Sequence, residues 1–281
     1  MAVSPSSNAQ QARQALAKRL ADLCRDAGLN GQDMADRCGW HRSKSSRIMN
    51  GRTPPSADDI RAWCRACGAE DQTEDLVASL RAADGMWVDW RRMERTGLRR
   101  AQEAVLPLFE RTRWFRSYSP SFVPGLLQTR DYTGAVLRAT QRRRVLIDDV
   151  DEAVAVRMAR QQILHQGGRF AFLAEESVLR NGLGGREVQR EQLEHLLAAG
   201  ALPSVSLGIV PTRTDRTRMP TEGFYMFDSA QVNVEMVSGY LTLVQPSEVR
   251  AYADTFTMLG DMAVFGAGAQ ALIGRALDDL R

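Results

Sequence analysis

Residues 29–51 read LNGQDMADRCGWHRSKSSRIMNG, and this stretch decides the fold of the N-terminal part of the chain. It predicts two short helices, over residues 32–38 and 42–49, because Gly39 suits the turn between them and Asn50 with Gly51 suits the left-handed backbone that ends a helix. Ala35 is the small residue that such a motif needs midway along its first helix. The apolar contacts between the helices come from Leu29, Met34, Trp40 and Ile48. The spacing therefore predicts a helix-turn-helix.

The outward face of the second short helix is polar and basic. Between positions 37 and 52 there is no acidic residue, and the basic residues there are Arg37, Arg42, Lys44, Arg47 and Arg52. A local basic face favours docking on phosphates, whereas a net charge of only +3 shows that the whole chain is not strongly basic. Arginine and lysine can bond both guanine acceptors in the major groove. The stretch predicts sequence-specific binding of double-stranded DNA; a helical bundle with a basic loop is the alternative.

Residues 29–51, with the prolines at 54 and 55 and the helix after them, resemble the Xre/Cro/C1 type of helix-turn-helix. The resemblance implies that Arg42 reads a base, that Ser43 and Lys44 contact bases or phosphates, and that Asn50 contacts phosphate. The expected DNA-binding residues are Gln32, Arg42, Ser43, Lys44, Ser46, Arg47, Asn50 and Arg52.

The sequence departs from that family at three positions. Gly31 stands where the family often has a phosphate-clamping glutamine, and Gln32 lies beside it. Ser45 occupies a position where an aliphatic core residue is common. Met49 replaces a frequent glutamate.

Helical signals surround the motif. Residues 9–27 have apolar side chains at helical spacing, Ser56 suits the N-cap of a helix that runs to Cys67, and residues 73–83 form a further helical pattern. We therefore expect a mainly α helix-turn-helix domain over residues 9–83. Residues 84–112 are expected to be a basic helical connector, either with a solvated face or with additional DNA contacts.

Residues 113–281 are expected to form an α+β domain. Strands are predicted over residues 113–123, 169–175 and 204–210, in a hairpin of residues 223–227 and 231–237 turning at 228–230, and over 240–244. Helices are predicted over residues 126–139, from about 148 to 166, and over 186–199, 247–263 and 267–280, with residues 142–144 in a loop. The aromatic residues that could serve either an interface or the core are Trp87, Trp90, Phe109, Trp114, Phe115, Tyr118 and Phe122.

The most distinctive string in this part is VPGLLQTRDY, at residues 123–132. With RMARQQ at 157–162, EESVLR at 175–180 and QLEHL at 192–196, it resembles the C-terminal domain of actinomycete Scr1-like, or antitoxin-like, transcriptional regulators. The resemblance covers residues 17–277. It implies a transcription regulator and makes a small protein partner, encoded by a neighbouring gene, an expected possibility.

The same residues also predict packing roles. Leu126 and Leu127 suit the core, and Gln128 with Thr129 suits a cap for the next helix. A buried polar network is the hypothesis for the charged and amide residues Arg157, Arg160, Gln161, Glu175 and Glu176.

No catalytic constellation is visible. The three histidines are not in HExxH spacing, no GxSxG occurs, and residues 182–185 lack the GK[ST] ending of a phosphate loop. Cys64 and Cys67 form a CxxC in a helical pattern without a second pair, which favours core positions over a metal site. We expect no enzyme, no cofactor and no metal, and a cytoplasmic protein with reduced cysteines, because neither a membrane span nor a secretory signal is apparent.

Three functional hypotheses follow. The first is a sequence-specific transcriptional regulator that acts as a homodimer, with the C-terminal domain for dimerisation and for partner or signal binding. The second is an antitoxin-like interaction protein that binds a small partner and regulates its own gene. The third is a regulator that senses a small molecule in the α+β domain.

Overall fold

The structure is a computed structural model that describes residues 5–85, 87–89, 97–144, 147–219, 222–237, 239–244 and 246–281. The chain divides into two compact units, Met1–Val88 and Asp89–Arg281. Within the described residues, no helix has the length and apolar character that crossing a membrane requires.

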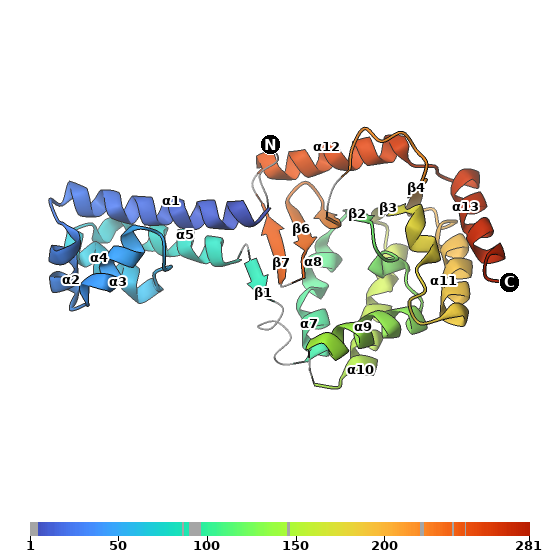
Figure 1. Ribbon diagram of the computed structural model, residues 1–281, viewed down its shortest axis with the longest axis horizontal. Helices are drawn as coiled ribbons and strands as arrows, with labels where there is room; N and C mark the ends of the chain where they lie inside the picture. The colour runs from blue at the N-terminus through green and yellow to red at the C-terminus, as the bar shows by residue number, and fades with distance from the viewer. Residues whose placement is uncertain are drawn as a thin grey trace. The chain divides into compact units, whose positions relative to one another are not determined.

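The first unit is helical (Figure 1). Its helices are α1 (Pro5–Asp26), α2 (Gly31–Cys38), α3 (Arg42–Met49), α4 (Ala57–Cys67) and α5 (Thr73–Gly85), with a 3₁₀ turn at Glu70–Gln72. The predicted helix-turn-helix pair is confirmed as α2 and α3, and α1 begins earlier than predicted. Trp63 lies at the centre of the core: it is fully buried and its Nε1 donates to the Leu20 carbonyl oxygen at 3.0 Å.

Side-chain caps explain where these helices begin. Asn30 accepts the backbone N–H groups of Gln32 and Asp33, and Ser56 accepts that of Asp59, each in a reciprocal capping box. Gly39 ends α2 with φ 66°, a left-handed conformation that glycine adopts without steric cost. The turn between α2 and α3 is therefore set by local sequence, as predicted.

The second unit contains a mixed sheet. Its strands are β2 (Trp114–Ser119), β3 (Arg169–Glu175), β4 (Val205–Val210), β5 (Phe224–Phe227), β6 (Gln231–Glu235) and β7 (Gly239–Leu243). They follow the order β7-β6-β5-β2-β3-β4, with β2, β3 and β4 parallel and the other pairs antiparallel. The mainly α first unit and the α+β second unit confirm the predicted fold class.

The helices of the second unit are α7 (Leu98–Ala104), α8 (Leu106–Arg111), α9 (Arg130–Arg144), α10 (Val150–Arg160), α11 (Arg186–Ala199), α12 (Pro246–Met262) and α13 (Ala267–Asp278). Short 3₁₀ helices lie at Gly125–Leu127, Gln161–His165 and Glu176–Arg180.

Three boundary predictions are wrong. The helical connector expected over residues 84–112 contains the strand β1 (Trp87–Asp89) before α7 and α8; residues 90–96, including Trp90, lie outside the described residues. The helix expected from residue 126 begins at Arg130, because a 3₁₀ turn precedes it. The loop expected at residues 142–144 continues α9.

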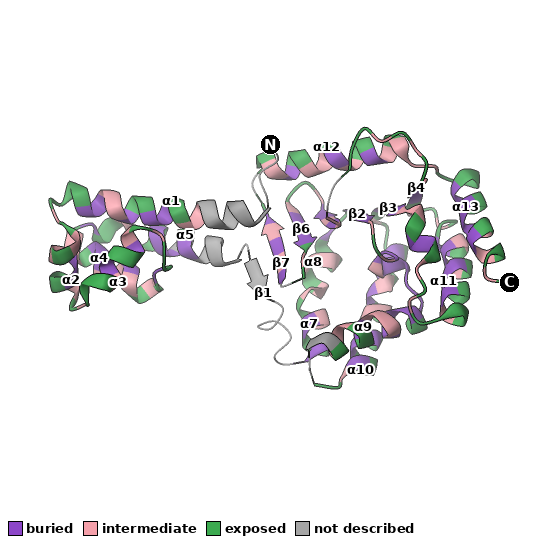
Figure 2. Ribbon diagram, viewed as in Figure 1, coloured by how far each residue is buried: buried purple, intermediate pink, exposed green. Residues whose placement is uncertain are grey.

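Helices cover both faces of the sheet (Figure 1). On one face, Phe109 of α8 lies with its ring centroid 5.3 Å from that of Phe115 and 5.1 Å from that of Phe227. On the other face, Phe224 lies 4.9 Å from Tyr252 of α12. Along these helices, buried residues alternate with exposed ones, as expected for helices that pack with one side only (Figure 2). Of the aromatic residues noted in the sequence, Phe115 and Tyr118 are buried and Phe109 packs against the core, whereas Trp114 is 37% exposed.

The hairpin turn between β5 and β6 is where the sequence placed it. Asp228 has φ 53°, and its Oδ1 accepts the backbone N–H groups of Arg113 at 3.1 Å and Trp114 at 2.8 Å. The carboxylate thus links this turn to the start of β2.

The string at residues 123–132 has the predicted packing role. Leu126 and Leu127 are buried, and the Thr129 Oγ1 accepts the backbone N–H of Tyr132 at 3.3 Å, which caps α9. The buried Gln128 donates to the Val123 carbonyl oxygen at 2.7 Å. This string therefore shapes the entrance to α9.

The predicted polar network is wrong in part, because its members separate into two groups. Gln161 donates to the Gln128 carbonyl oxygen at 2.7 Å and Arg157 donates to Gln102 at 2.9 Å. Glu175 instead accepts two hydrogen bonds from Arg216, at 2.8 and 2.5 Å, and one from the Tyr118 hydroxyl at 2.7 Å. Glu176 accepts the Thr212 N–H at 2.9 Å. The two glutamates thus form hydrogen bonds with the segment after β4, at Thr212 and Arg216, and not with the arginines of α10.

Candidate nucleic-acid interface

Helix α3 presents a polar surface on one side and packs on the other. Its residues Ser45 and Ile48 are buried, at 0% and 1% exposure. The side chains at Arg42, Ser43, Ser46 and Arg47 are exposed. This division follows the helical period, so these four side chains lie on one continuous face.

Four predicted residues from three parts of the chain meet at an open hollow of about 600 Å³. Gln32 comes from the first turn of α2, Arg42 and Ser46 come from α3, and Asn50 comes from the turn after α3. The hollow is completed by Ala21, Asn30, Gly31 and Met49. Gln32 therefore reaches this surface, although the residue before it is glycine instead of the glutamine typical of the resembled family.

Local hydrogen bonds hold several of these side chains. Asn50 donates to the Ser46 carbonyl oxygen at 2.7 Å, Arg47 donates to that of Ser43 at 3.1 Å, and Gln32 donates to Asp36 at 2.9 Å. Arg52 is exposed in the turn after α3. Within the described ranges, the Arg42 guanidinium has no hydrogen-bond or ion-pair partner, so its donors are available to an external acceptor.

Lys44, unlike Arg42, has partners within the protein. Its Nζ lies 2.6 Å from Asp59 Oδ1 and 4.4 Å from the centroid of the Trp40 ring, and the residue is half-buried. Burial acts to raise the pKa of Asp59, but hydrogen bonds from Lys44 and Ser56 hold that pKa below its usual value. Lys44 therefore ties α3 to the start of α4, and its expected contact with bases or phosphates stays a prediction.

Ser45 has a structural role that the sequence did not indicate. Its buried hydroxyl lies 2.7 Å from the Gly31 carbonyl oxygen and 3.0 Å from that of Arg42. A hydroxyl has one hydrogen to donate, so it is shared between α2 and the first turn of α3. The serine thus replaces aliphatic packing with a polar link between the two helices of the motif.

Ser45→Ala is expected to lower the free energy of unfolding of the first unit by about 1 kcal/mol, because a buried hydrogen bond is lost without a replacement. Amide hydrogen exchange in α2 and α3 measures this loss. Ser46→Ala, on the exposed side of the same helix, is the matched stability control and should leave exchange unchanged. Equal exchange in the two variants would contradict the assigned role of Ser45.

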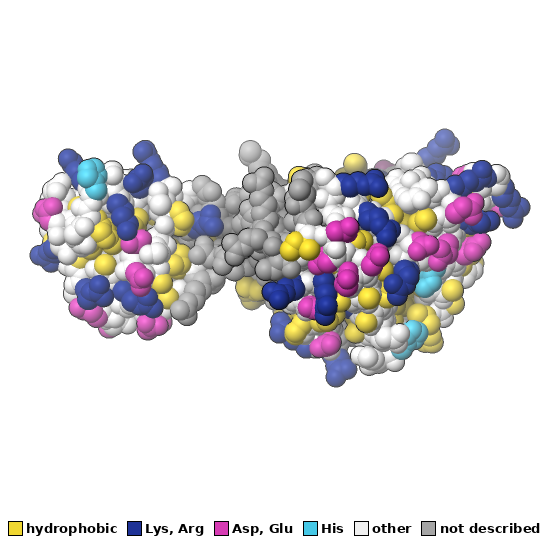
Figure 3. Space-filling view, turned by 90° about the horizontal axis from the view of Figure 1, so that it is seen from below, with side chains coloured by type: hydrophobic (Ala, Val, Ile, Leu, Met, Phe, Trp, Pro, Cys, Tyr) yellow, Lys and Arg dark blue, Asp and Glu magenta, His cyan; other side chains and the backbone are white. Residues whose placement is uncertain are grey.

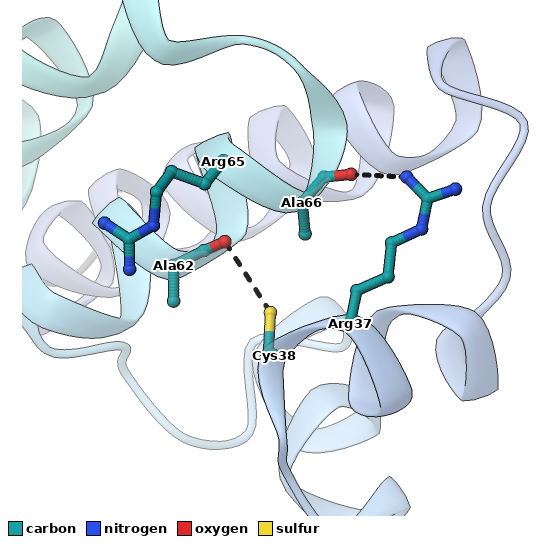
Figure 4. A pocket seen from close by; sticks show the side chains of 5 residues that line it. All are labelled: Arg37, Cys38, Ala62, Arg65 and Ala66. Atoms are coloured by element: carbon teal, nitrogen blue, oxygen red, sulfur yellow. Dashed lines mark hydrogen bonds between the residues drawn. The ribbon is translucent and has the colours of Figure 1, made fainter.

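A second hollow, of about 360 Å³, lies between α2 and α4 (Figure 4). Arg37 donates to the Ala66 carbonyl oxygen at 2.8 Å, and the Cys38 thiol donates to that of Ala62 at 3.6 Å. None of the predicted DNA-binding residues lines it. These contacts join the end of α2 to α4, and Arg65, which also lines the hollow, points away from Arg37 (Figure 4).

The cysteines of the CxxC occupy core positions, as predicted. Cys64 is fully buried and Cys67 packs against the same cluster. Burial raises the pKa of the Cys67 thiol to about 12, which keeps it protonated at neutral pH. In the part of the chain that the structure describes, no three His, Cys, Asp or Glu side chains are grouped to hold a metal ion.

The second unit shows no comparable basic surface on the face seen in Figure 3, where acidic and basic side chains are interspersed. The exposed arginines of α3, Arg42 and Arg47, are the candidate contacts for phosphates.

Comparison with protein families gives two matches. Residues 15–77 match a helix-turn-helix domain, and residues 108–275, more than half of the chain, match a domain of unknown function, DUF5753. A comparison with curated proteins gave no match. The first match includes α2, α3 and α4, the helices that build the surface described above.

Proposed function

Because the chain belongs to the DUF5753 family and carries a helix-turn-helix domain at its N-terminal end, we propose that it is a sequence-specific DNA-binding transcriptional regulator. Helix α3 enters the major groove, and the first turn of α2 lies against the DNA backbone. We propose no enzymatic activity for the protein and expect it to act in the cytoplasm, where the DNA lies.

One observation carries this proposal: Gln32, Arg42, Ser46 and Asn50 meet at one open surface, and Arg42 is free of internal partners among the described residues. A free guanidinium can donate two parallel hydrogen bonds to guanine O6 and N7. The amide and hydroxyl groups around it suit phosphate oxygens. One site can thus both recognise a base and bind the phosphates of the DNA backbone.

Selection from a pool of random duplexes tests the proposal. The full-length chain should enrich a defined motif. Methylation of guanine N7, in the major groove, should then prevent binding to that motif, whereas methylation of adenine N3, in the minor groove, should not. Failure to enrich any motif would refute sequence-specific binding, and interference by adenine N3 alone would refute the placement of α3.

Arg47→Ala is expected to weaken binding to all duplexes about equally and to reduce the slope of log K against log salt by about 1, because Arg47 contacts only phosphate in this proposal. Titrations of the selected duplex at several salt concentrations measure the slope. Arg65→Ala removes an exposed arginine at the far end of α4 and should leave the slope unchanged. A change in sequence preference with Arg47→Ala would contradict a phosphate-only role.

We further propose that the helix-turn-helix domain is of the Xre/Cro/C1 type and that the whole chain resembles the Scr1-like regulators. We also propose that the protein acts as a homodimer. Helix-turn-helix dimers bind half-sites roughly 34 Å apart, so the selected motif should be a repeat with that spacing. The second unit has its own hydrophobic core, and we assign the dimer contact or the binding of a small protein partner to it. Light scattering should give twice the chain mass of 31.2 kDa; a monomer at all concentrations would exclude the dimer.

A further inference from the structure

His41 is the N-cap of α3, immediately before the proposed base-reading Arg42. Its Nδ1 lies 3.2 Å from the backbone nitrogen of Ser43, whose N–H it accepts, and 2.8 Å from the Ser43 Oγ. The residue is exposed. In the described ranges no hydrogen bond or ion pair engages the other ring nitrogen, Nε2.

The contact with the Ser43 N–H indicates where the ring hydrogen lies. Because Nδ1 accepts the Ser43 N–H, it carries no hydrogen, and the hydrogen of the neutral ring is on Nε2. Since Nδ1 then has no hydrogen to give, the 2.8 Å contact is a hydrogen bond in which the Ser43 hydroxyl donates, and its hydrogen shares the single Nδ1 lone pair with the Ser43 N–H. The hydroxyl hydrogen is therefore used inside the protein, and the Ser43 Oγ offers only lone pairs to the outside.

We propose that His41 and Ser43 form one DNA-reading pair, in which His41 Nε2–H donates to an acceptor on the DNA and the Ser43 Oγ accepts from the exocyclic amino group of adenine or cytosine. This inference rests on the proposed function and adds a contact residue and a base preference to it. In the major groove, only adenine N6 and cytosine N4 present amino donors. The base facing Ser43 is thus adenine or cytosine.

His41→Asn separates reading from capping. The asparagine oxygen can still accept the Ser43 N–H as an N-cap, so α3 retains its start. The variant loses the Nε2–H donor and frees the Ser43 hydroxyl to rotate and donate. Ser43→Ala removes the acceptor itself, and His165→Asn, at an exposed histidine of the second unit, is the matched control.

The test is selection from random duplexes with each full-length variant, followed by titration of the duplex that the unchanged protein selects. One motif position should be restricted to adenine or cytosine, and His41→Asn and Ser43→Ala should each relax it. His41→Asn should also weaken binding about tenfold, and the double variant should lose less than the sum of the single losses, because the two residues act together.

The outcomes separate this inference from the proposed function. No motif for the unchanged protein would overturn both. A motif that His41→Asn selects unchanged, with affinity equal to that of His165→Asn, would overturn the reading pair alone. A loss of affinity that is equal for all sequences would place the His41 acceptor on a phosphate and overturn the claim that the pair sets a base preference. Nitrogen NMR of the free protein supplies a further check, since a ring hydrogen on Nδ1 would overturn the pair regardless of DNA binding.

Discussion

Trp63→Ala is expected to remove about 3–5 kcal/mol from the free energy of unfolding of the first unit. Trp63 is fully buried, its ring centroid lies 6.0 Å from that of Trp40, and its Nε1 donates to the Leu20 carbonyl oxygen. Alanine would leave a large cavity and an unpaired backbone acceptor. Because a domain of this size has only about 5–10 kcal/mol of stability, a large share of it would be lost.

Hydrogen exchange of the full-length chain measures this effect separately in each unit. Protection should fall throughout α1 to α5 and stay unchanged in the strands β2 to β4. Trp63→Phe keeps most of the ring and should lose clearly less. A loss below about 1 kcal/mol in Trp63→Ala would contradict the central position of Trp63 in this core.

Arg42→Ala is expected to weaken binding to the selected duplex by about 1–3 kcal/mol and to relax the preference at one base position. The guanidinium has no internal partner among the described residues, so its removal should cost the protein little stability. Competition between duplexes that differ at single positions measures the preference.

Arg42→Lys is the matched control, because lysine keeps the charge but presents one ammonium group instead of the planar fork of arginine. It should retain most of the binding to unrelated duplexes and lose part of the base preference. An Arg42→Ala variant with unchanged affinity and preference would show that Arg42 does not read a base.

The parts of the fold that could be predicted from sequence are those set by local signals. The bounds of α3, the Ser56 capping box, the Gly39 turn and the hairpin at Asp228 each depend on residues within a few positions of one another. The strands of the second unit were recognisable because short apolar runs lie between clear turn residues.

The missed features depend on contacts between distant residues. Lys44 pairs with Asp59, fifteen positions away, and Glu175 pairs with Arg216, forty-one positions away. From the sequence alone, Ser45 only replaces an aliphatic core residue. In the structure, its hydroxyl donates a hydrogen bond to the Gly31 carbonyl oxygen at the start of α2. In each case the residue type was visible, but its partner was determined by how the helices and strands cross.

For the candidate site, helical period identified the exposed face of α3, including Arg42, Ser46 and Arg47. The helical period could not show that Gln32 and Asn50 line the same hollow as Arg42 and Ser46. The resemblance had implied a phosphate contact for Asn50, and Gln32 lies next to the position at which the family often has a phosphate-binding glutamine. The capping role of His41 was also missed, because histidine is not among the usual N-cap residues.

The most direct test of the central claim, that α3 reads DNA sequence, is the equilibrium affinity of the full-length chain for its selected duplex and for a scrambled duplex of the same composition at physiological salt. We predict a preference of about 10³-fold or more, largely lost in Arg42→Ala. Equal, weak and strongly salt-dependent binding to both duplexes would show that the protein recognises only the phosphate backbone and would contradict sequence-specific recognition by this helix.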